Sequence, residues 1–173
     1  MNPFVVIGIL GIGALALSLW KTAKAAVNLT YNIEKFRIYN ISLKKIVFEL
    51  VAKFANPQNT PLHIQMVNLT AYVDAQYTTT TNNGKTVYNV QNVGLPLCTA
   101  TDNKAFVIEP NGFTMHSFYP EISLLNILTG ALSKVVEKIR TGSVDRPRNV
   151  LIKGFIKAEG VKIDVLTVIP LQS

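Results

Sequence analysis

Few side chains in this sequence could carry out chemistry. The 173 residues include two histidines, His63 and His116, and one cysteine, Cys98. Each histidine alternates with apolar residues, as expected on the polar face of a β-sheet, and two histidines are too few for a usual zinc site. Cys98 lies in the stretch "LPLCTA". A half-buried structural thiol is the simpler interpretation there, and a nucleophile beside a histidine is the alternative.

A phosphate-binding loop and an acid–base pair are also disfavoured. Residues 83–86, "NGKT", resemble the end of a nucleotide-binding loop, but Thr79 occupies the position where that loop needs its first glycine. The acidic residues are scattered, with no close pair suited to acid–base catalysis. We therefore predict a protein that is not an enzyme, with no catalytic or metal-binding residues, no cofactor and no small-molecule substrate.

The charge balance predicts anionic partners. Lys and Arg number 17 against 10 Asp and Glu, which gives a formal net charge of +7 and favours lipid head groups, acidic proteins or nucleic acid. Aromatic residues do not interleave with the basic ones as a stacking platform would require, so nucleic acid is unlikely. A basic cluster late in the chain could face an acidic protein; it consists of Lys138, Arg140, Arg146, Arg148, Lys153 and Lys157.

The N-terminal segment is the most apolar part of the chain. Residues 3–20 read "PFVVIGILGIGALALSLW" and contain no charge. A helix over residues 4–20 would span about 25 Å, close to the thickness of a hydrocarbon core. A secretory signal peptide and a buried core helix are the alternatives. We predict a transmembrane anchor with a basic flank within residues 1–27, built on side chains that include Phe4, Ile7, Leu10, Leu15, Leu17 and Trp20.

Basic residues follow the apolar segment directly. Lys21 and Lys24, and then Lys35 and Arg37, are placed to contact anionic lipid, and each can add about 1 kcal/mol of attraction. The residues before the segment include no basic side chain. The positive-inside rule therefore predicts a single-pass protein with its main domain on the cytoplasmic side.

The remainder of the chain is typical of a β-protein. Residues 28–43 are expected to form a juxtamembrane linker with a first strand, and residues 44–173 a β-sandwich. Residues 46–55 alternate clearly between apolar and polar. Residues 62–66 and 69–75 also alternate, but out of phase with each other, which predicts a β-bulge or a corner between them.

Turns and one helix complete the predicted order of elements. Asn83-Gly84 and residues 158–160 are expected to close two hairpins. The spacing of apolar residues predicts a helix over about 120–141, ended by Gly142. Six to eight short strands with regular turns indicate an antiparallel β-sandwich of immunoglobulin or fibronectin-III type, with one late helix.

Asn56-Pro57 interrupts two good strands in "VAKFANPQNTPLHIQ". Proline cannot donate to a sheet ladder, so Pro57 stops the first strand, and Pro61 sets the backbone for the next one. The Asn56 side chain can bond a downstream backbone group and close a turn. We predict a structural turn, in which Asn56→Ala costs about 0.5–2 kcal/mol.

The same region resembles the late-embryogenesis-abundant type 2 family, whose domain is also called the WHy domain. The chain is similar to that family's first two core strands in "KIVFELVAKFANPQNTPLHIQMVNLTAYVD", to its middle strands in "FVIEPNGFTMHSFYPEIS", and to its closing hairpin in "NVLIKGFIKAEGVKIDVLTVIPL". The resemblance covers most of residues 44–171. It implies a β-sandwich without catalytic residues that is associated with stress protection, membranes or structural roles.

These patterns predict a non-enzymatic, membrane-anchored structural or interaction protein. In one interpretation it links a lipid membrane to other protein subunits of a shell, as in a virion that contains a membrane. In the other it is a cellular stress or envelope protein of the resembled family, which protects membranes or proteins. Both interpretations remain open at the level of sequence.

Overall fold

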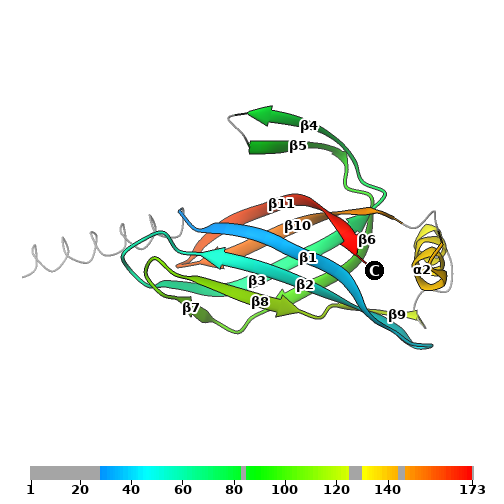
Figure 1. Cartoon of the computed structure of the whole chain (residues 1–173), viewed down its shortest axis with the longest axis horizontal. Coiled ribbons are helices and arrows are strands. Elements are labelled where there is room, and N and C mark those ends of the chain that lie inside the picture. The colour runs from blue at the N-terminus through cyan, green and yellow to red at the C-terminus, as the bar shows by residue number, and fades with distance from the viewer. Residues whose placement is uncertain (1–27, 83–84, 125–129, 144–146, 173) are drawn as a thin grey trace, which may run out of the picture.

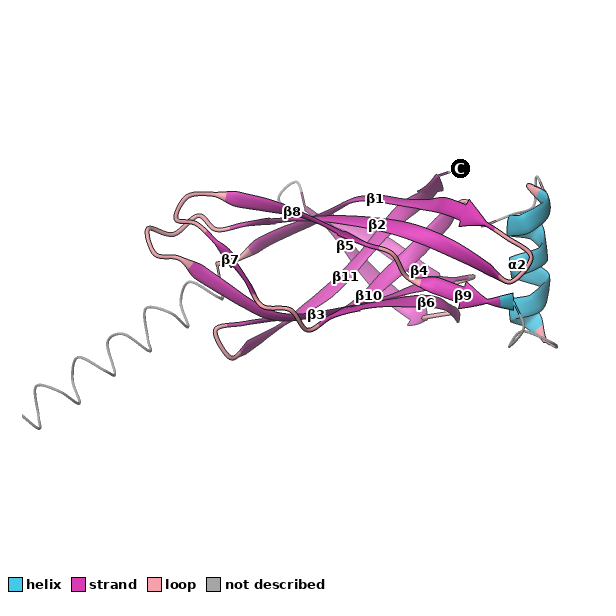
Figure 2. Cartoon of the chain, turned by 90° about the horizontal axis from the view of Figure 1, so that it is seen from below, coloured by secondary structure: helices cyan, strands magenta, loops and turns pink. Residues whose placement is uncertain are grey.

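A computed structural model describes residues 28–82, 85–124, 130–143 and 147–172, and strands dominate them (Figure 1). Two layers of strands enclose one apolar core (Figure 2). The first layer consists of β1 (Thr30–Ile41), β2 (Lys45–Ala55), β8 (Phe113–Phe118) and β9 (Glu121–Ser123). The second consists of β3 (Leu62–Val73), β6 (Leu95–Asp102), β7 (Phe106–Ile108), β10 (Asn149–Ala158) and β11 (Val161–Gln172).

The two layers are continuous at one edge. β1 and β11 pair in parallel at Phe36↔Leu171 and Arg37↔Gln172. Nine of the described strands thus form one sheet in the order β6-β3-β10-β11-β1-β2-β8, with β7 beside β3 and β9 beside β2. The other pairs of this sheet are antiparallel. The fold is mainly β and sandwich-like, as predicted, and the parallel β1–β11 pair departs from the antiparallel pairing that the sequence indicates.

β1 is an integral strand of the sandwich. It pairs with β2 from Thr30↔Ala55 to Ile41↔Ile46. Its buried Phe36 stacks on Phe48 of β2, with ring centroids 5.1 Å apart. The predicted boundary between residues 43 and 44 falls in the turn between these two strands, which share one core.

β3 contains the predicted bulge. Leu62 and Ile64 are buried, and the buried phase then changes to Val67 and Leu69. The register against β10 shifts at the same place. The phase change comes at residues 65–66, slightly earlier than the sequence indicates.

The predicted helix over residues 120–141 is wrong at its start. Residues 121–123 are strand β9, which pairs with the beginning of β2, and Ile122 is buried opposite Ile46. The backbone N–H of Phe48 also donates to the carbonyl of Pro120, so the free edge of β2 holds this segment extended. The described helix, α2 (Ala131–Thr141), ends at Gly142 in the left-handed conformation, as predicted.

In both predicted hairpins, the two strands pair with each other. β10 and β11 meet around Glu159 and Gly160, which both have positive φ. β4 (Gln76–Asn82) and β5 (Lys85–Asn92) form a separate two-stranded sheet that stands away from the layers (Figure 1). The expected turn at 83–84 and the expected anchor within 1–27 lie outside the described residues. Among those described, no helix has the length and apolarity to cross a bilayer.

Candidate functional site

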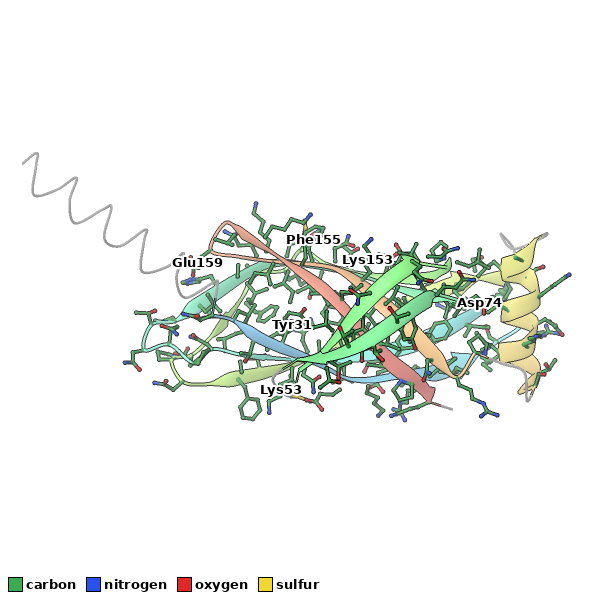
Figure 3. All side chains as sticks on the ribbon, turned by 90° about the horizontal axis from the view of Figure 1, so that it is seen from above. Tyr31, Lys53, Asp74, Lys153, Phe155 and Glu159 are labelled. Atoms are coloured by element: carbon green, nitrogen blue, oxygen red, sulfur yellow. The ribbon has the colours of Figure 1, made fainter. Side chains whose placement is uncertain are left out.

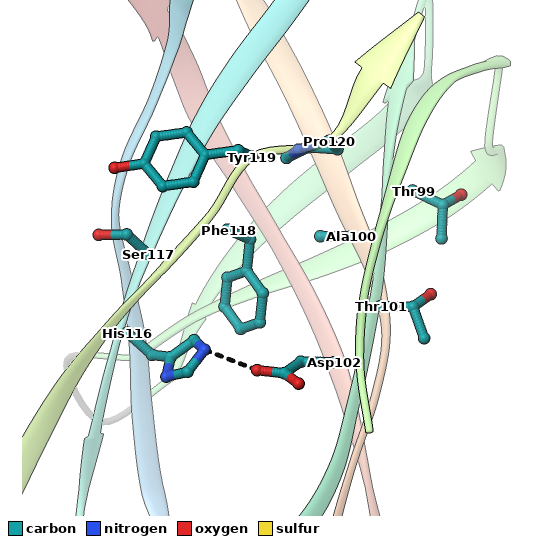
Figure 4. Close-up of a pocket in the computed structure, with 9 residues that line it drawn as sticks. All are labelled: Thr99, Ala100, Thr101, Asp102, His116, Ser117, Phe118, Tyr119 and Pro120. Atoms are coloured by element: carbon teal, nitrogen blue, oxygen red, sulfur yellow. Dashed lines mark ion pairs between the residues drawn. The ribbon is translucent and has the colours of Figure 1, made fainter. Parts of the chain in front are cut away.

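An open cleft of about 260 Å³ lies between β6 and β8, the two ends of the strand order (Figure 4). Its walls are residues 99–102 of β6 and residues 116–120 of β8 and the segment after it. β6 pairs with β3 and β8 pairs with β2, so the sides that face the cleft belong to the free edges of the sheet. Side chains therefore make the connection across this opening.

His116 bridges the cleft. Its Nε2 atom lies 2.8 Å from Oδ2 of Asp102 on the opposite layer. The imidazole also stacks on Phe106, with centroids 5.0 Å apart, and contacts the ring of Phe118. A carboxylate that orients a histidine in this way can prepare it for general-base catalysis, provided that a nucleophile lies within reach of the free nitrogen.

The hydroxyl groups near His116 are directed elsewhere. Ser117 points to the other side of β8 (Figure 4), because successive side chains of a strand alternate. Thr99 Oγ1 lies 3.0 Å from Oγ1 of Thr70 on the outer face of the sheet. The geometry therefore supports a bridge between the layers better than a catalytic pair.

Cys98 and His63 do not join this site. Cys98 is buried, and desolvation raises the pKa of its thiol to about 12, so the reactive thiolate is scarce at neutral pH. His63 pairs with Glu159 instead, at 2.6 Å between Nδ1 and Oε1. Within the described ranges, no group of three or more His, Cys, Asp and Glu residues could hold a metal ion.

Two of the predicted lipid-contact residues, Lys35 and Arg37, converge on Glu49. Arg37 Nε lies 2.6 Å and Lys35 Nζ lies 3.4 Å from the same carboxylate oxygen. Glu49 is only 8% exposed. The hydrogen bond from Arg37, assisted by Lys35 and opposed by burial, lowers the pKa of Glu49. The structure therefore gives these two cations an internal partner, while Lys21 and Lys24 lie outside the described residues.

An aromatic pair adjoins this ion cluster. The rings of Tyr39 and Tyr119 meet edge to face with centroids 5.1 Å apart, and both side chains are more than half exposed. The Tyr119 hydroxyl donates to Glu49 over 3.4 Å. The outer face of β1, β2 and β8 thus carries ordered charged and aromatic groups beside one another.

Asn56 binds two separate loops together. Its Nδ2 donates to the carbonyl oxygens of Thr60 at 2.7 Å, Ile108 at 3.2 Å and Glu109 at 3.3 Å. Its Oδ1 accepts from the backbone N–H of Gln58 at 3.1 Å, which is the local turn expected from sequence. The side chain is 1% exposed. Asn56 therefore fixes the β2–β3 connection, where Pro57 and Pro61 are exposed, to the β7–β8 turn.

The predicted basic cluster is spread along the molecule. Lys138 and Arg140 lie on α2, whereas Lys153 and Lys157 lie along the outer face of β10. Arg148 precedes β10, and Arg146 lies outside the described residues. These charges therefore do not form one compact patch.

Sequence reasoning did not identify Asp102 and Glu49 as partners of His116 and Arg37. The sequence does contain a hint of the Glu49 pair. Glu49 lies on the polar face of its strand, and the preceding strand carries Lys35 and Arg37. The His116–Asp102 pair had no such hint, because its members lie on the two free edges of the sheet, which come together only in the fold.

Comparison with known proteins finds distant structural neighbours only. No family model and no curated protein matches this sequence. A protein from Archaeoglobus fulgidus shares 13% identity over 83% of this chain and 91% of its own, with a TM-score of 0.44. A protein described as late embryogenesis abundant shares 10% identity over 94% and 87% of the two chains, with a TM-score of 0.31. An uncharacterised β-sandwich protein from Clostridium difficile shares 13% identity over 80% of each chain, with a TM-score of 0.29.

Proposed function

We propose that this chain is a non-enzymatic, membrane-anchored structural protein that links a lipid bilayer to other protein subunits. A membrane enclosed by a protein shell, as in a virion with an internal membrane, is the assembly that fits best. Residues 4–20 would be the single bilayer span. Lys21 and Lys24 would keep the sandwich on the cytoplasmic side, or on the side that faces the shell.

This proposal rests on the distance between two opposite ends of the sandwich, the one where β1 begins and the one where α2 lies. β1 begins at the end of the elongated molecule opposite α2, and it runs to the end where α2 and β9 lie (Figure 1). An anchor that precedes β1 would therefore attach to one end and leave the other end free for a second partner. A short rigid spacer between two surfaces requires this arrangement.

The α2 end offers a surface for that second partner. The β1–β2 turn lies there, because the backbone N–H of Leu124 donates to the carbonyl of Lys44. Leu43, at the tip of the turn, is 89% exposed, and Ile41 is 41% exposed beside it. Exposed apolar side chains next to lysines suit a protein partner with an acidic, partly apolar surface.

The cleft supports a role without catalysis. His116 is oriented by Asp102, but the neighbouring Ser117 points away from it, and burial raises the pKa of the Cys98 thiol to about 12. A bridge that holds two free sheet edges together is useful in a protein that bears load or contacts partners. No cofactor or small-molecule substrate is part of this proposal.

A cellular stress or envelope role is the second candidate. The observation that favours it is the resemblance of the Asn56-Pro57 strands and the closing hairpin to the late-embryogenesis-abundant type 2 family. In that role the sandwich would protect membranes or proteins and would need no defined shell.

Fractionation of the native source tests the proposal. The full chain should remain with membranes through a high-salt wash, and deletion of residues 1–26 should release it. Leu43→Asp should stay in membranes but fail to enter the larger assembly, whereas Val87→Asp, at an exposed site on β5, should behave as wild type. Release of the full chain by salt alone would refute the anchor. Normal assembly of Leu43→Asp would refute the role of the α2 end.

A further inference from the structure

A second exposed apolar surface lies on the outer face of the first layer. Phe113 is 63% exposed and Met115 is 50% exposed, and both belong to β8. The ammonium group of Lys53 lies 4.5 Å from the centroid of the Phe113 ring. We call Lys53, Phe113 and Met115 the β8 corner.

The register of the sheet places this corner beside the start of β1. Ala55 of β2 pairs with Thr30 on one side and with Phe113 on the other. Neighbouring strands lie about 4.8 Å apart, so Phe113 is about 10 Å from the first residue of β1. Figure 3 shows Lys53 in the half of the molecule away from α2. The β8 corner is therefore at the end from which the N-terminal segment departs.

The chain between the apolar N-terminal segment and β1 is short. Residues 21–29 separate Trp20 from Thr30. The ten Cα–Cα steps from Trp20 to Thr30 span at most about 36 Å when fully extended. A linker of this length allows a bilayer that contains residues 4–20 to have its surface at the β8 corner.

The chemistry of the corner suits a bilayer surface. Aromatic rings and flexible apolar side chains favour the interface, and a lysine can extend its ammonium toward lipid phosphate. A hollow of about 280 Å³ adjoins Lys53 and is lined also by Thr30, Tyr31, Asn32, Glu34 and Ala55. The hollow thus presents one cation and one anion, which complement the phosphate and the amine of a phospholipid head group.

We propose that the β8 corner contacts the phospholipid bilayer, with Phe113 and Met115 in the interfacial layer and Lys53 beside lipid phosphate. This inference rests on the proposed function, because only an anchored chain would hold the corner at a bilayer. This contact would be a second attachment to the membrane, and it would determine which face of the sandwich lies against the bilayer.

Depth-dependent quenching in vesicles tests this contact with the full chain. Trp20 is the single tryptophan, so Trp20→Phe provides a background without tryptophan emission. Phe113→Trp is then added, and the chain is reconstituted in phosphatidylcholine–phosphatidylglycerol vesicles that contain lipid brominated near the head group. Leu166→Trp, on the outer face of β11, and Tyr119→Trp, toward the α2 end, are the matched controls. Circular dichroism verifies that each variant is folded.

The expected result is quenching of the probe at position 113 by about twofold, as for an aromatic ring at the interface, with little change at positions 119 and 166. Equal, weak quenching at all three positions in chains that resist a high-salt wash would overturn the β8 corner contact and leave the anchor intact. Loss of the chains from the vesicles in that wash would overturn the anchor and this inference together.

Discussion

Asn56→Ala should destabilise the sandwich by about 3 kcal/mol. The two amide hydrogens of the side chain are donated to three carbonyl oxygens, those of Thr60, Ile108 and Glu109. The amide oxygen accepts a hydrogen bond from one backbone N–H. This amounts to three effective hydrogen bonds, each worth about 1 kcal/mol net at a buried site. The structure thus raises the cost expected from sequence, about 0.5–2 kcal/mol, which counted only a local turn.

Two variants separate the amide donor from the carbonyl acceptor. Asn56→Asp keeps an oxygen for the N–H of Gln58 but turns the donor into a second oxygen that faces carbonyls. At neutral pH it should be at least as destabilising as Asn56→Ala, because a buried charge would lie beside three acceptors. Asn59→Ala is the control in the same loop, where an exposed side chain bonds only Asn111, and it should cost less than about 0.5 kcal/mol.

Urea unfolding of residues 28–173, followed by circular dichroism, measures these costs. With a slope of about 2 kcal/mol per molar urea, Asn56→Ala should lower the midpoint by about 1.5 M. A wild-type midpoint for Asn56→Ala would refute the reasoning that these bonds stabilise the fold. If that variant also failed to assemble, the turn would be a contact surface and not a structural stop.

Three further outcomes follow from single positions. Gly154→Ala should cost about 3 kcal/mol in urea unfolding, because its Cβ would lie 2.0 Å from the carbonyl oxygen of Asn68; a cost below about 1 kcal/mol would show that β10 can shift. Glu49→Gln should lose about 1–2 kcal/mol at pH 7. Arg37 lowers the pKa of folded Glu49, so the extra stability of the wild type over Glu49→Gln is lost as the pH falls through that lowered pKa. The urea unfolding curves of the two proteins should therefore converge in acid. A difference in stability that persists in acid would exclude the ion pair as its cause. Cys98, with its pKa raised to about 12 by burial, should react with iodoacetamide at pH 8 only after unfolding, and rapid labelling of the native protein by mass spectrometry would contradict its burial.

The alternation of residues 46–55 was sufficient to predict β2, and the phase change in residues 62–75 was sufficient to predict a bulge in β3. Turn residues such as Glu159-Gly160 predicted the closing hairpin. These features depend on neighbours in sequence, because side chains of a strand alternate and tight turns need particular backbone conformations. The helix was harder to place. Ile122 fits a helical spacing, but the edge of β2, some 75 residues earlier, holds it in a strand.

The sequence by itself therefore determined that this protein is mainly β, where most of its strands and hairpins fall, that Asn56 closes a local turn, and that residues 4–20 have the composition of an anchor. Only the tertiary structure decided which distant groups meet. Four features all depend on strand register: the parallel β1–β11 pair, the Arg37–Glu49 ion pair, the loops joined by Asn56, and the alignment of Thr30, Ala55 and Phe113 across three strands. Register is set by burying one face of every strand in a shared core, and that condition involves the whole chain at once.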